Sequence, residues 1–136
     1  RNMTFLEGCA RAWRGSLAEA GMTLGDLDLV ETHDCFTTAE LMEYEAMGLT
    51  ELGGGARAAL EGWTAKDGRL PVNPSGGLKA KGHPIGATGV SMHVLTTMQV
   101  LGEAGDMQVA GAEVAGVFNM GGTGVANYCS IDDDGE

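Results

Sequence analysis

The sequence predicts an α/β domain in which helices and a β-sheet form layers. The first observation is length, because 136 residues favour a single domain. The second is composition, since 43% of the residues are hydrophobic and 20% are charged, as in ordinary globular proteins. The third is the order of patterns along the chain, which is helix, strand, helix, strand, helix, strand, strand.

The first half of the chain contains two helix patterns and one strand pattern. Apolar residues recur every four positions behind a capping-box pattern at residues 4–7, and Gly21 ends this helix. Residues 27–32 predict a strand. A second capping-box pattern predicts a helix that starts near residue 37 and ends at Gly48.

The second half contains a short helix pattern at residues 56–63 and a longer one that begins at Pro84 and runs to about residue 101. Three segments have strand patterns: residues 70–73, 113–118 and 125–131. The Pro84 helix is apolar over most of its circumference, so it requires protein on every side. One small domain can hardly cover such a helix, which predicts a second layer outside this chain. The chain also begins at Arg1 with a helical pattern under way, as a fragment of a longer protein would.

Charge excludes two classes of partner. Eight Lys and Arg against nineteen Asp and Glu give a formal net charge of −11, whereas nucleic acids and anionic membranes bind positive surfaces. Polar residues interrupt the longest apolar segment, residues 90–101, which excludes a membrane-spanning helix. The basic residues that can meet an anion form one cluster: Lys66, Arg69, Lys79 and Lys81.

Cysteine usage predicts reduced thiols in an intracellular protein, because Cys9, Cys35 and Cys129 share no metal-ligand spacing and cannot all pair. Cys35 belongs to the segment His-Asp-Cys-Phe at residues 33–36. His33 and Cys35 lie two apart in a strand-like stretch and can face one cavity, and the following helix start would lower the pKa of the thiol. The alternative is a buried structural cysteine beside a hydrogen-bonded histidine.

Two Gly-rich segments also concentrate chemistry. Residues 73–89 contain Gly82-His83-Pro84, in which the dipole of a following helix favours a neutral His83 imidazole. The alternatives are a tight turn or a phosphate site, although the Walker and Rossmann spacings are absent. Residues 119–124 form either a plain hairpin or a turn whose amides face a developing oxyanion.

Together, these three segments resemble the carboxy-terminal domain of thiolases, of the sterol-carrier-protein-2 type and its bacterial thiolase-like, lipid-transfer-protein relatives. The resemblance covers essentially the whole chain. It implies a layered α-β-α thiolase half with a mixed sheet and a central buried helix, packed on a like-folded amino-terminal half. Residues 1–131 would be that domain, and residues 132–136 an acidic frayed terminus.

The resemblance also implies roles for individual residues. His83 matches the histidine that activates the nucleophilic cysteine and contributes to an oxyanion hole. His33 takes the place of an asparagine that holds a water in that hole, and Cys35 matches a proposed acid/base. Gly121 matches the glycine whose amide helps to form a second oxyanion hole. Asn119 departs from the common pattern, in which a cysteine stands at that position.

The nucleophilic cysteine of thiolases lies on the amino-terminal domain, and no residue here matches its context. Cys9 and Cys129 are expected in the core, and His93 is expected to be structural. Lys79 and Lys81 flank the His83 segment and could contact a CoA phosphate, although exposed lysines usually only keep a surface hydrated.

The resemblance therefore implies part of an acyl-CoA acyltransferase that cleaves 3-oxoacyl-CoA by thiolysis or runs the reverse condensation. CoA and acyl-CoA would be substrates, with no covalently bound cofactor and no metal, in a homodimer of the cytoplasm or, in a eukaryote, the peroxisome. One alternative is a thiolase-like aldolase subunit that works beside a small partner protein. The others are a non-catalytic acyl-CoA-binding domain and a generic anion-binding module.

Overall fold

The computed structural model describes residues 3–135, so the expectations that concern residues 1, 2 and 136 lie outside the described residues. The helices are α1 (Glu7–Ala20), α2 (Thr37–Met47), α3 (Gly55–Leu60), α4 (Gly77–Lys81) and α5 (Thr88–Val100), with single turns η1 (Leu24–Asp26) and η2 (Gly105–Met107). The strands are β1 (Leu29–Thr32), β2 (Val114–Gly121) and β3 (Ala126–Asp133).

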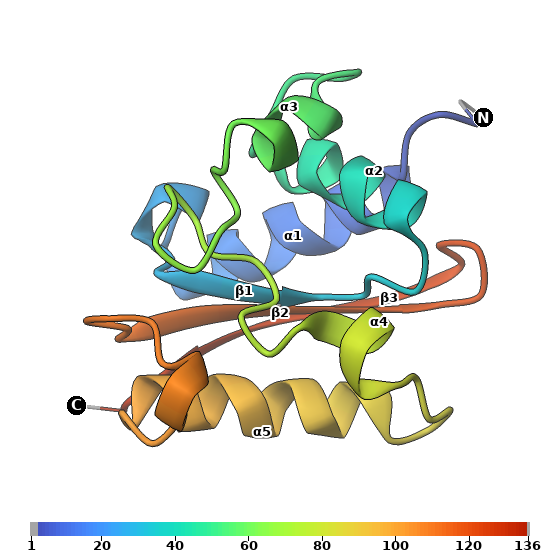
Figure 1. The fold of residues 1–136 in the computed structure, drawn as a ribbon. Helices are drawn as coiled ribbons and strands as arrows, with labels where there is room; N and C mark the ends of the chain where they lie inside the picture. Colours follow the sequence, from blue (N-terminus) through green and yellow to red (C-terminus); the bar gives the residue numbers. More distant parts are fainter. Residues whose placement is uncertain (1–2, 136) are drawn as a thin grey trace.

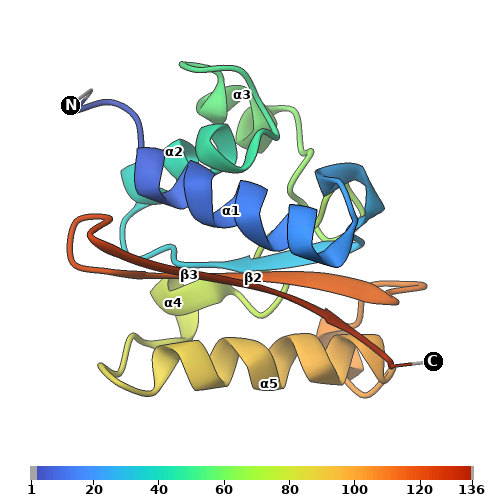
Figure 2. The same cartoon turned by 180° about the vertical axis from the view of Figure 1, so that it is seen from behind.

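The strands form one mixed sheet, as the resemblance implies, and their order is β1-β2-β3. β1 runs parallel to β2, and β2 pairs with β3 as an antiparallel hairpin. The strand expected at residues 70–73 is reduced to a single parallel bridge between Val72 and Val30. Helices α1, α2 and α3 cover one face of the sheet, and α4 and α5 cover the other (Figures 1 and 2). The domain is therefore an α-β-α sandwich.

The core on the α1 face is built around Trp13. Cys9, Trp13 and Leu17 recur along α1 and are buried against the sheet, as their spacing predicts. The Trp13 ring stacks on Phe118 with 6.3 Å between ring centroids. Gly116 lies under the indole, where an added Cβ would come within 2.7 Å of a ring carbon.

Both predicted capping boxes are wrong, although both predicted glycine stops are confirmed. Within the described part of the chain, neither α1 nor α2 receives a side-chain cap hydrogen bond. Leu6, and not Thr4, directly precedes α1, with a non-helical backbone at φ of −86° and ψ of 74°. Glu40 cannot cap α2 because its carboxylate binds Tyr44 and Lys79. Gly21 and Gly48 end their helices with φ of 69° and 89°, which glycine adopts without strain.

The helix expected from Pro84 begins instead at Thr88, because the Pro84 carbonyl closes a turn with the amides of Ala87 and Thr88. The short helix α4 before that turn was not expected from the sequence. Within this chain α5 is not a central buried helix. Its inner face carries Thr88, Met92, Thr96 and Gln99, whereas apolar Val90, Val94 and Leu101 are exposed. The sheet covers only one side of α5.

Residues 132–136 were expected to form a frayed terminus. Asp132 and Asp133 instead belong to strand β3, so the expectation is wrong for these two residues. Asp132 accepts a hydrogen bond of 2.6 Å from the Thr96 hydroxyl, and this contact ties the strand to α5. Among residues 3–135, no helix is both long and apolar enough to cross a membrane.

Candidate functional site

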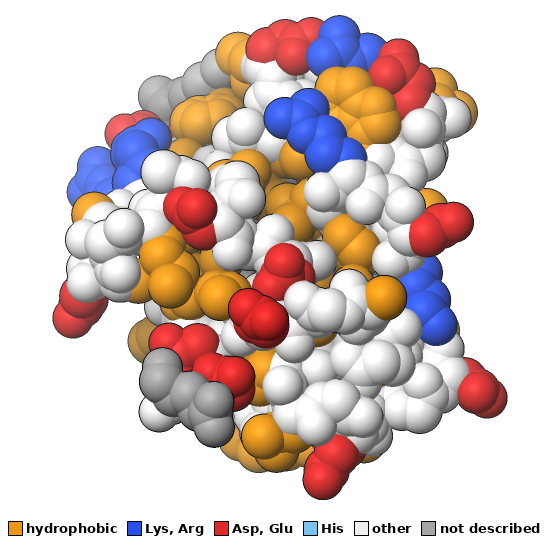
Figure 3. Space-filling view, turned by 90° about the vertical axis from the view of Figure 1, so that its left-hand side faces the viewer, with side chains coloured by type: hydrophobic (Ala, Val, Ile, Leu, Met, Phe, Trp, Pro, Cys, Tyr) orange, Lys and Arg blue, Asp and Glu red, His pale blue; other side chains and the backbone are white. Residues whose placement is uncertain are grey.

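The predicted site residues gather where β1 and β2 end. Because these strands are parallel, their carboxyl ends lie at the same edge of the sheet. Thr32 pairs with Phe118, so His33 and Asn119, the next residues along, are neighbours. The loop between α4 and α5, at the right-hand end of Figure 1, carries His83 to the same edge. Figure 3 looks onto the opposite end of the molecule, where no histidine is visible and basic side chains form no continuous patch.

His33 is held in one tautomer by Asn119. Its Nδ1 lies 2.7 Å from the Asn119 Oδ1, and a carbonyl oxygen can only accept, so Nδ1–H is the donor. The ring is 5% exposed, and burial, together with the neighbouring His83, lowers the pKa of His33. The imidazole is therefore neutral at physiological pH, with its lone pair on Nε2.

His83 meets His33 edge-on, with 4.8 Å between the ring centroids. Its Nδ1 lies 2.7 Å from the Thr88 Oγ1, and that hydroxyl donates to the Pro84 carbonyl at 3.2 Å. Since the hydroxyl hydrogen is used, Nδ1–H of His83 donates, and in the neutral ring Nε2 then carries the lone pair. Thr88 therefore orients this exposed ring.

Cys35 lies on the same side of the sheet as His83. It is half-buried and packs against Leu78 of α4, Met92 of α5 and Val117 of β2. Burial, followed by the nearby Glu43 carboxyl, raises the pKa of the thiol. The expectation that the start of α2 would lower this pKa is wrong, because desolvation outweighs the helix start. Cys35 is a protonated thiol at neutral pH, which suits a proton donor.

Asn119 and Gly121 share a face of β2, because residues two apart along a strand point the same way. Asn119 lies against the start of α5, where a Cβ on Gly89 would come within 2.7 Å of the Asn119 Nδ2. Gly121 ends the strand opposite Ala126 at the hairpin. A glycine at position 89 therefore allows the amide of Asn119 to reach His33.

Lys79 and Lys81, which flank the His83 segment, have partners inside the chain. Lys79 pairs with Glu40 and lies 3.3 Å from Asp34, and Lys81 lies 3.5 Å from Glu31. These ion pairs compensate carboxylates at the end of β1, and nothing about them indicates a phosphate site.

The remaining singled-out residues have structural contacts. Cys9 is buried in the core and Cys129 is half-buried beside Ser16, whose hydroxyl donates to its sulfur at 2.9 Å. His93 bridges the carbonyl of Gly89 and the hydroxyl of Ser130, both at 2.7 Å, and so links α5 to β3. Within residues 3–135, no group of three His, Cys, Asp or Glu side chains could hold a metal ion.

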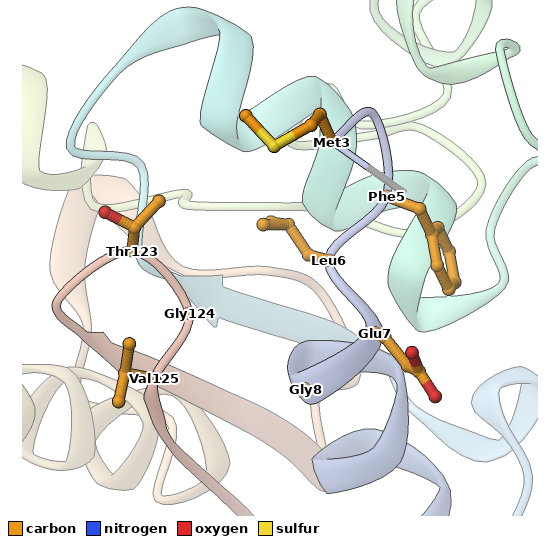
Figure 4. Close-up of a pocket in the computed structure, with 8 residues that line it drawn as sticks. All are labelled: Met3, Phe5, Leu6, Glu7, Gly8, Thr123, Gly124 and Val125. Carbon is orange, nitrogen blue, oxygen red and sulfur yellow. The ribbon is translucent and has the colours of Figure 1, made fainter. Parts of the chain in front are cut away.

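A small apolar cavity of about 210 Å³ lies between the start of α1 and the β2–β3 hairpin (Figure 4). Leu6 and Val125 line it from opposite sides, and Met3 closes its top. It contains none of the predicted site residues, so it is separate from the histidine pair.

Comparison with known proteins decides the family. Residues 1–133 match the family described as "Thiolase C-terminal domain-like". The chain belongs to this family. A thiolase carboxy-terminal domain is normally paired with an amino-terminal thiolase domain.

Individual relatives support this membership. The chain is 48% identical over 124 residues to an acetyl-CoA acetyltransferase of Methanothermobacter thermautotrophicus, a match that covers 91% of this chain and 32% of the relative. It is 46% identical over 110 residues to human sterol carrier protein 2, covering 81% of this chain and 20% of that protein. It is 37% identical over 91 residues to the benzoylsuccinyl-CoA thiolase subunit BbsB of Thauera aromatica, covering 67% and 24%. The chain thus spans a third or less of the length of these relatives.

A solved structure shares the fold. The Ltp2-ChsH2(DUF35) aldolase superposes with a TM-score of 0.78 at 22% identity, over 94% of this chain and 32% of that chain. At this identity, the likeness supports the thiolase-like fold alone.

Sequence reasoning missed four polar residues that hydrogen-bond around the candidate site. Thr88 orients His83, and Asp34, Glu31 and Ser75 hold the segment that precedes it. Asp34 stands between His33 and Cys35, so its position in the motif was the one available signal. The others are brought together by tertiary contacts.

Proposed function

We propose that this domain supplies one half of an acyl-CoA thiolase site, which cleaves a 3-oxoacyl-CoA with CoA or runs the reverse condensation. The observation that carries the proposal is the paired arrangement of His33 and His83. Each ring has Nδ1–H bound to a neighbour, so Nε2 is the nitrogen left to accept a proton in the neutral ring. A protonated Cys35 thiol lies on the same side of the sheet. The acyl-CoA enzymes among the relatives add support.

In this mechanism, His83 Nε2 takes the proton of a nucleophilic cysteine on the amino-terminal domain. The resulting imidazolium can then donate to the oxygen of the attacked carbonyl. His33 Nε2 can only accept, so it would act through a water that donates its other hydrogen to a thioester oxygen. The Gly121 amide supplies a further donor.

Cys35 completes the proton transfers. Attack on the 3-oxo carbon breaks the bond between C2 and C3, and the enolate of the departing acyl-CoA takes the proton of the Cys35 thiol. The thiolate of Cys35 then takes the proton of the incoming CoA thiol, and CoA attacks the acyl-enzyme. His83 returns its proton to the departing sulfur of the nucleophilic cysteine, which restores both cysteines. A thiol whose pKa burial raises is suited to the first of these steps. The proposal includes a homodimer in the cytoplasm or, in a eukaryote, the peroxisome.

The test is thiolysis of acetoacetyl-CoA by the intact protein that carries this domain. Cys35→Ala and His83→Ala are each expected to lower kcat by about 100-fold or more, whereas His93→Ala, a matched histidine with structural contacts, stays within about threefold. His83→Ala should also slow alkylation of the nucleophilic cysteine. Near-normal thiolysis by Cys35→Ala in a folded protein would contradict the assignment.

The products distinguish the alternatives. Thiolysis of a 3-oxoacyl-CoA consumes one CoA and yields two thioesters. Aldol cleavage of a 3-hydroxyacyl-CoA instead yields one thioester and a free carbonyl compound without consuming CoA. A non-catalytic acyl-CoA-binding domain would give neither set of products.

A further inference from the structure

Two fully buried carboxylates stand near the end of β1, and the mechanism does not use them. Glu31 and Asp34 each have only 1% of their surface exposed. Burying a carboxylate is costly unless ion pairs and hydrogen bonds replace its hydration. Their partners therefore show what these carboxylates hold in place.

Glu31 holds the segment that enters α4 and the residue that ends it. Its Oε2 accepts a hydrogen bond of 2.8 Å from the Ser75 hydroxyl, and its Oε1 accepts one of 3.3 Å from the Ser75 amide. Lys81, the last residue of α4, lies 3.5 Å from the same carboxylate.

Asp34 holds the first turn of the same helix. Its Oδ1 accepts a bond of 2.6 Å from the Leu78 amide, and the Lys79 ammonium lies 3.3 Å from its Oδ2. A Cβ on Gly77 would come within 2.2 Å of that oxygen, so only a glycine allows the carboxylate to reach the backbone of α4.

Helix α4 cannot hold this position unaided. It has five residues and buries one large apolar side chain, Leu78, and helices this short are unstable without outside contacts. Gly82 and His83 follow it directly, in an exposed loop. The placement of α4 therefore decides where His83 meets His33.

We propose that Asp34 and Glu31 are positioning residues, which clamp α4 to the end of β1 and thereby set the His83 ring against His33. Lys79 and Lys81 are the counter-ions of this clamp. The proposal deepens the proposed function, on which it rests for the role of the histidine pair.

The test compares Asp34→Asn with Asp28→Asn in the intact protein. Asp28 is the matched control, because its carboxylate also accepts two backbone amides, those of Glu113 and Val114 at 2.9 Å, at the opposite end of the sheet. The first readout is the nuclear Overhauser effect between ring protons of His33 and His83. The second is kcat per titrated active site, with KM measured alongside.

Asp34→Asn is expected to abolish the ring-to-ring Overhauser effect and to lower kcat by about 10- to 100-fold with KM unchanged, while Asp28→Asn keeps both at the wild-type level. Lys81→Met removes the ammonium group at the exposed end of the clamp and should weaken the Overhauser effect. If Asp34→Asn fails to fold, the result for Lys81→Met tests the clamp in its place. A wild-type Overhauser effect in folded Asp34→Asn or in Lys81→Met would overturn the clamp. The Overhauser effect needs no turnover, so it tests the clamp even if the protein shows no thiolysis.

Discussion

At the scale of single residues, Glu43 carries a buried carboxyl group that the sequence did not single out. Its side chain is 0% exposed, and its Oε2 accepts a hydrogen bond of 2.6 Å from the Thr32 hydroxyl. Its Oε1 has no hydrogen-bond partner among residues 3–135. Burial raises the pKa of this carboxyl well above the ordinary 4.5. The group is therefore stabilised as the neutral acid.

A pH-dependent gain in stability is expected for Glu43→Gln. Above pH 4.5 this carboxyl ionises in the unfolded chain but stays protonated in the fold, so the wild type loses stability as pH rises toward the folded pKa. Glutamine does not titrate. The variant's advantage should therefore grow by up to about 1.4 kcal/mol per pH unit inside that window. Urea unfolding at pH 5 and pH 7 measures it, and an equal difference at both values would contradict a neutral Glu43.

The sequence singled out the side chains that are proposed to react, but not the residues that hold them in place. His33, Cys35 and His83 stand in short motifs, so a resemblance to a known family was enough to propose roles for them. Their pKa directions and hydrogen bonds could not be assigned in the same way. The Cys35 thiol was expected to be acidified by a helix start, whereas packing against Leu78 and Met92 desolvates it.

At the scale of elements, the contact of α1 with the sheet depends on a strand glycine. Gly116 leaves room for the Trp13 ring, and an added Cβ would lie within 2.7 Å of it. A rigid indole cannot move aside in a close-packed core without displacing α1.

We therefore expect Gly116→Ala to destabilise the domain by about 1–3 kcal/mol, through overpacking against Trp13. Gly15→Ala is the matched control, because Gly15 lies inside α1 with nothing within 4 Å of its added Cβ. It should stabilise by up to about 1 kcal/mol through helix propensity. Chemical denaturation of both variants checks the pair, and a neutral Gly116→Ala would show that α1 is not seated on this glycine.

Helix ends were easier to predict than helix starts. Gly21 and Gly48 stop their helices because a left-handed residue is a local requirement that glycine meets. At the start of α2, Glu40 binds Lys79 from another segment instead of capping its own helix. Such competition between distant partners cannot be read from local sequence.

At the scale of the whole molecule, the apolar outer face of α5 matters most. Val90, Val94 and Leu101 recur at helical spacing and are exposed by 68%, 53% and 56%. The all-round apolar pattern thus predicted the need for another layer, although in this chain the helix is covered on one side only. In this family an amino-terminal thiolase domain is normally present to pair with the carboxy-terminal one.

If that domain covers α5, a charge on its outer face should destabilise the intact protein. Val94→Lys is expected to cost at least about 2 kcal/mol, because it would bury an unpaired ammonium. Glu19→Lys, on the exposed side of α1, is the control and should change stability by less than about 0.5 kcal/mol. Equal thermal unfolding of the two variants would place α5 in solvent.

The topology of the sheet also bears on the order in which the chain folds. A short turn between Gly121 and Ala126 joins β2 and β3, so this hairpin can form early in folding. β1 instead pairs with a strand that is distant in sequence, since Leu29 lies opposite Ala115. Such distant pairings carry a large loop-closure entropy, which slows their formation. The histidine pair needs β1, β2 and the loop before α5 in place at once. The histidine pair is thus expected to form last, after the β2–β3 hairpin and the elements around it have folded.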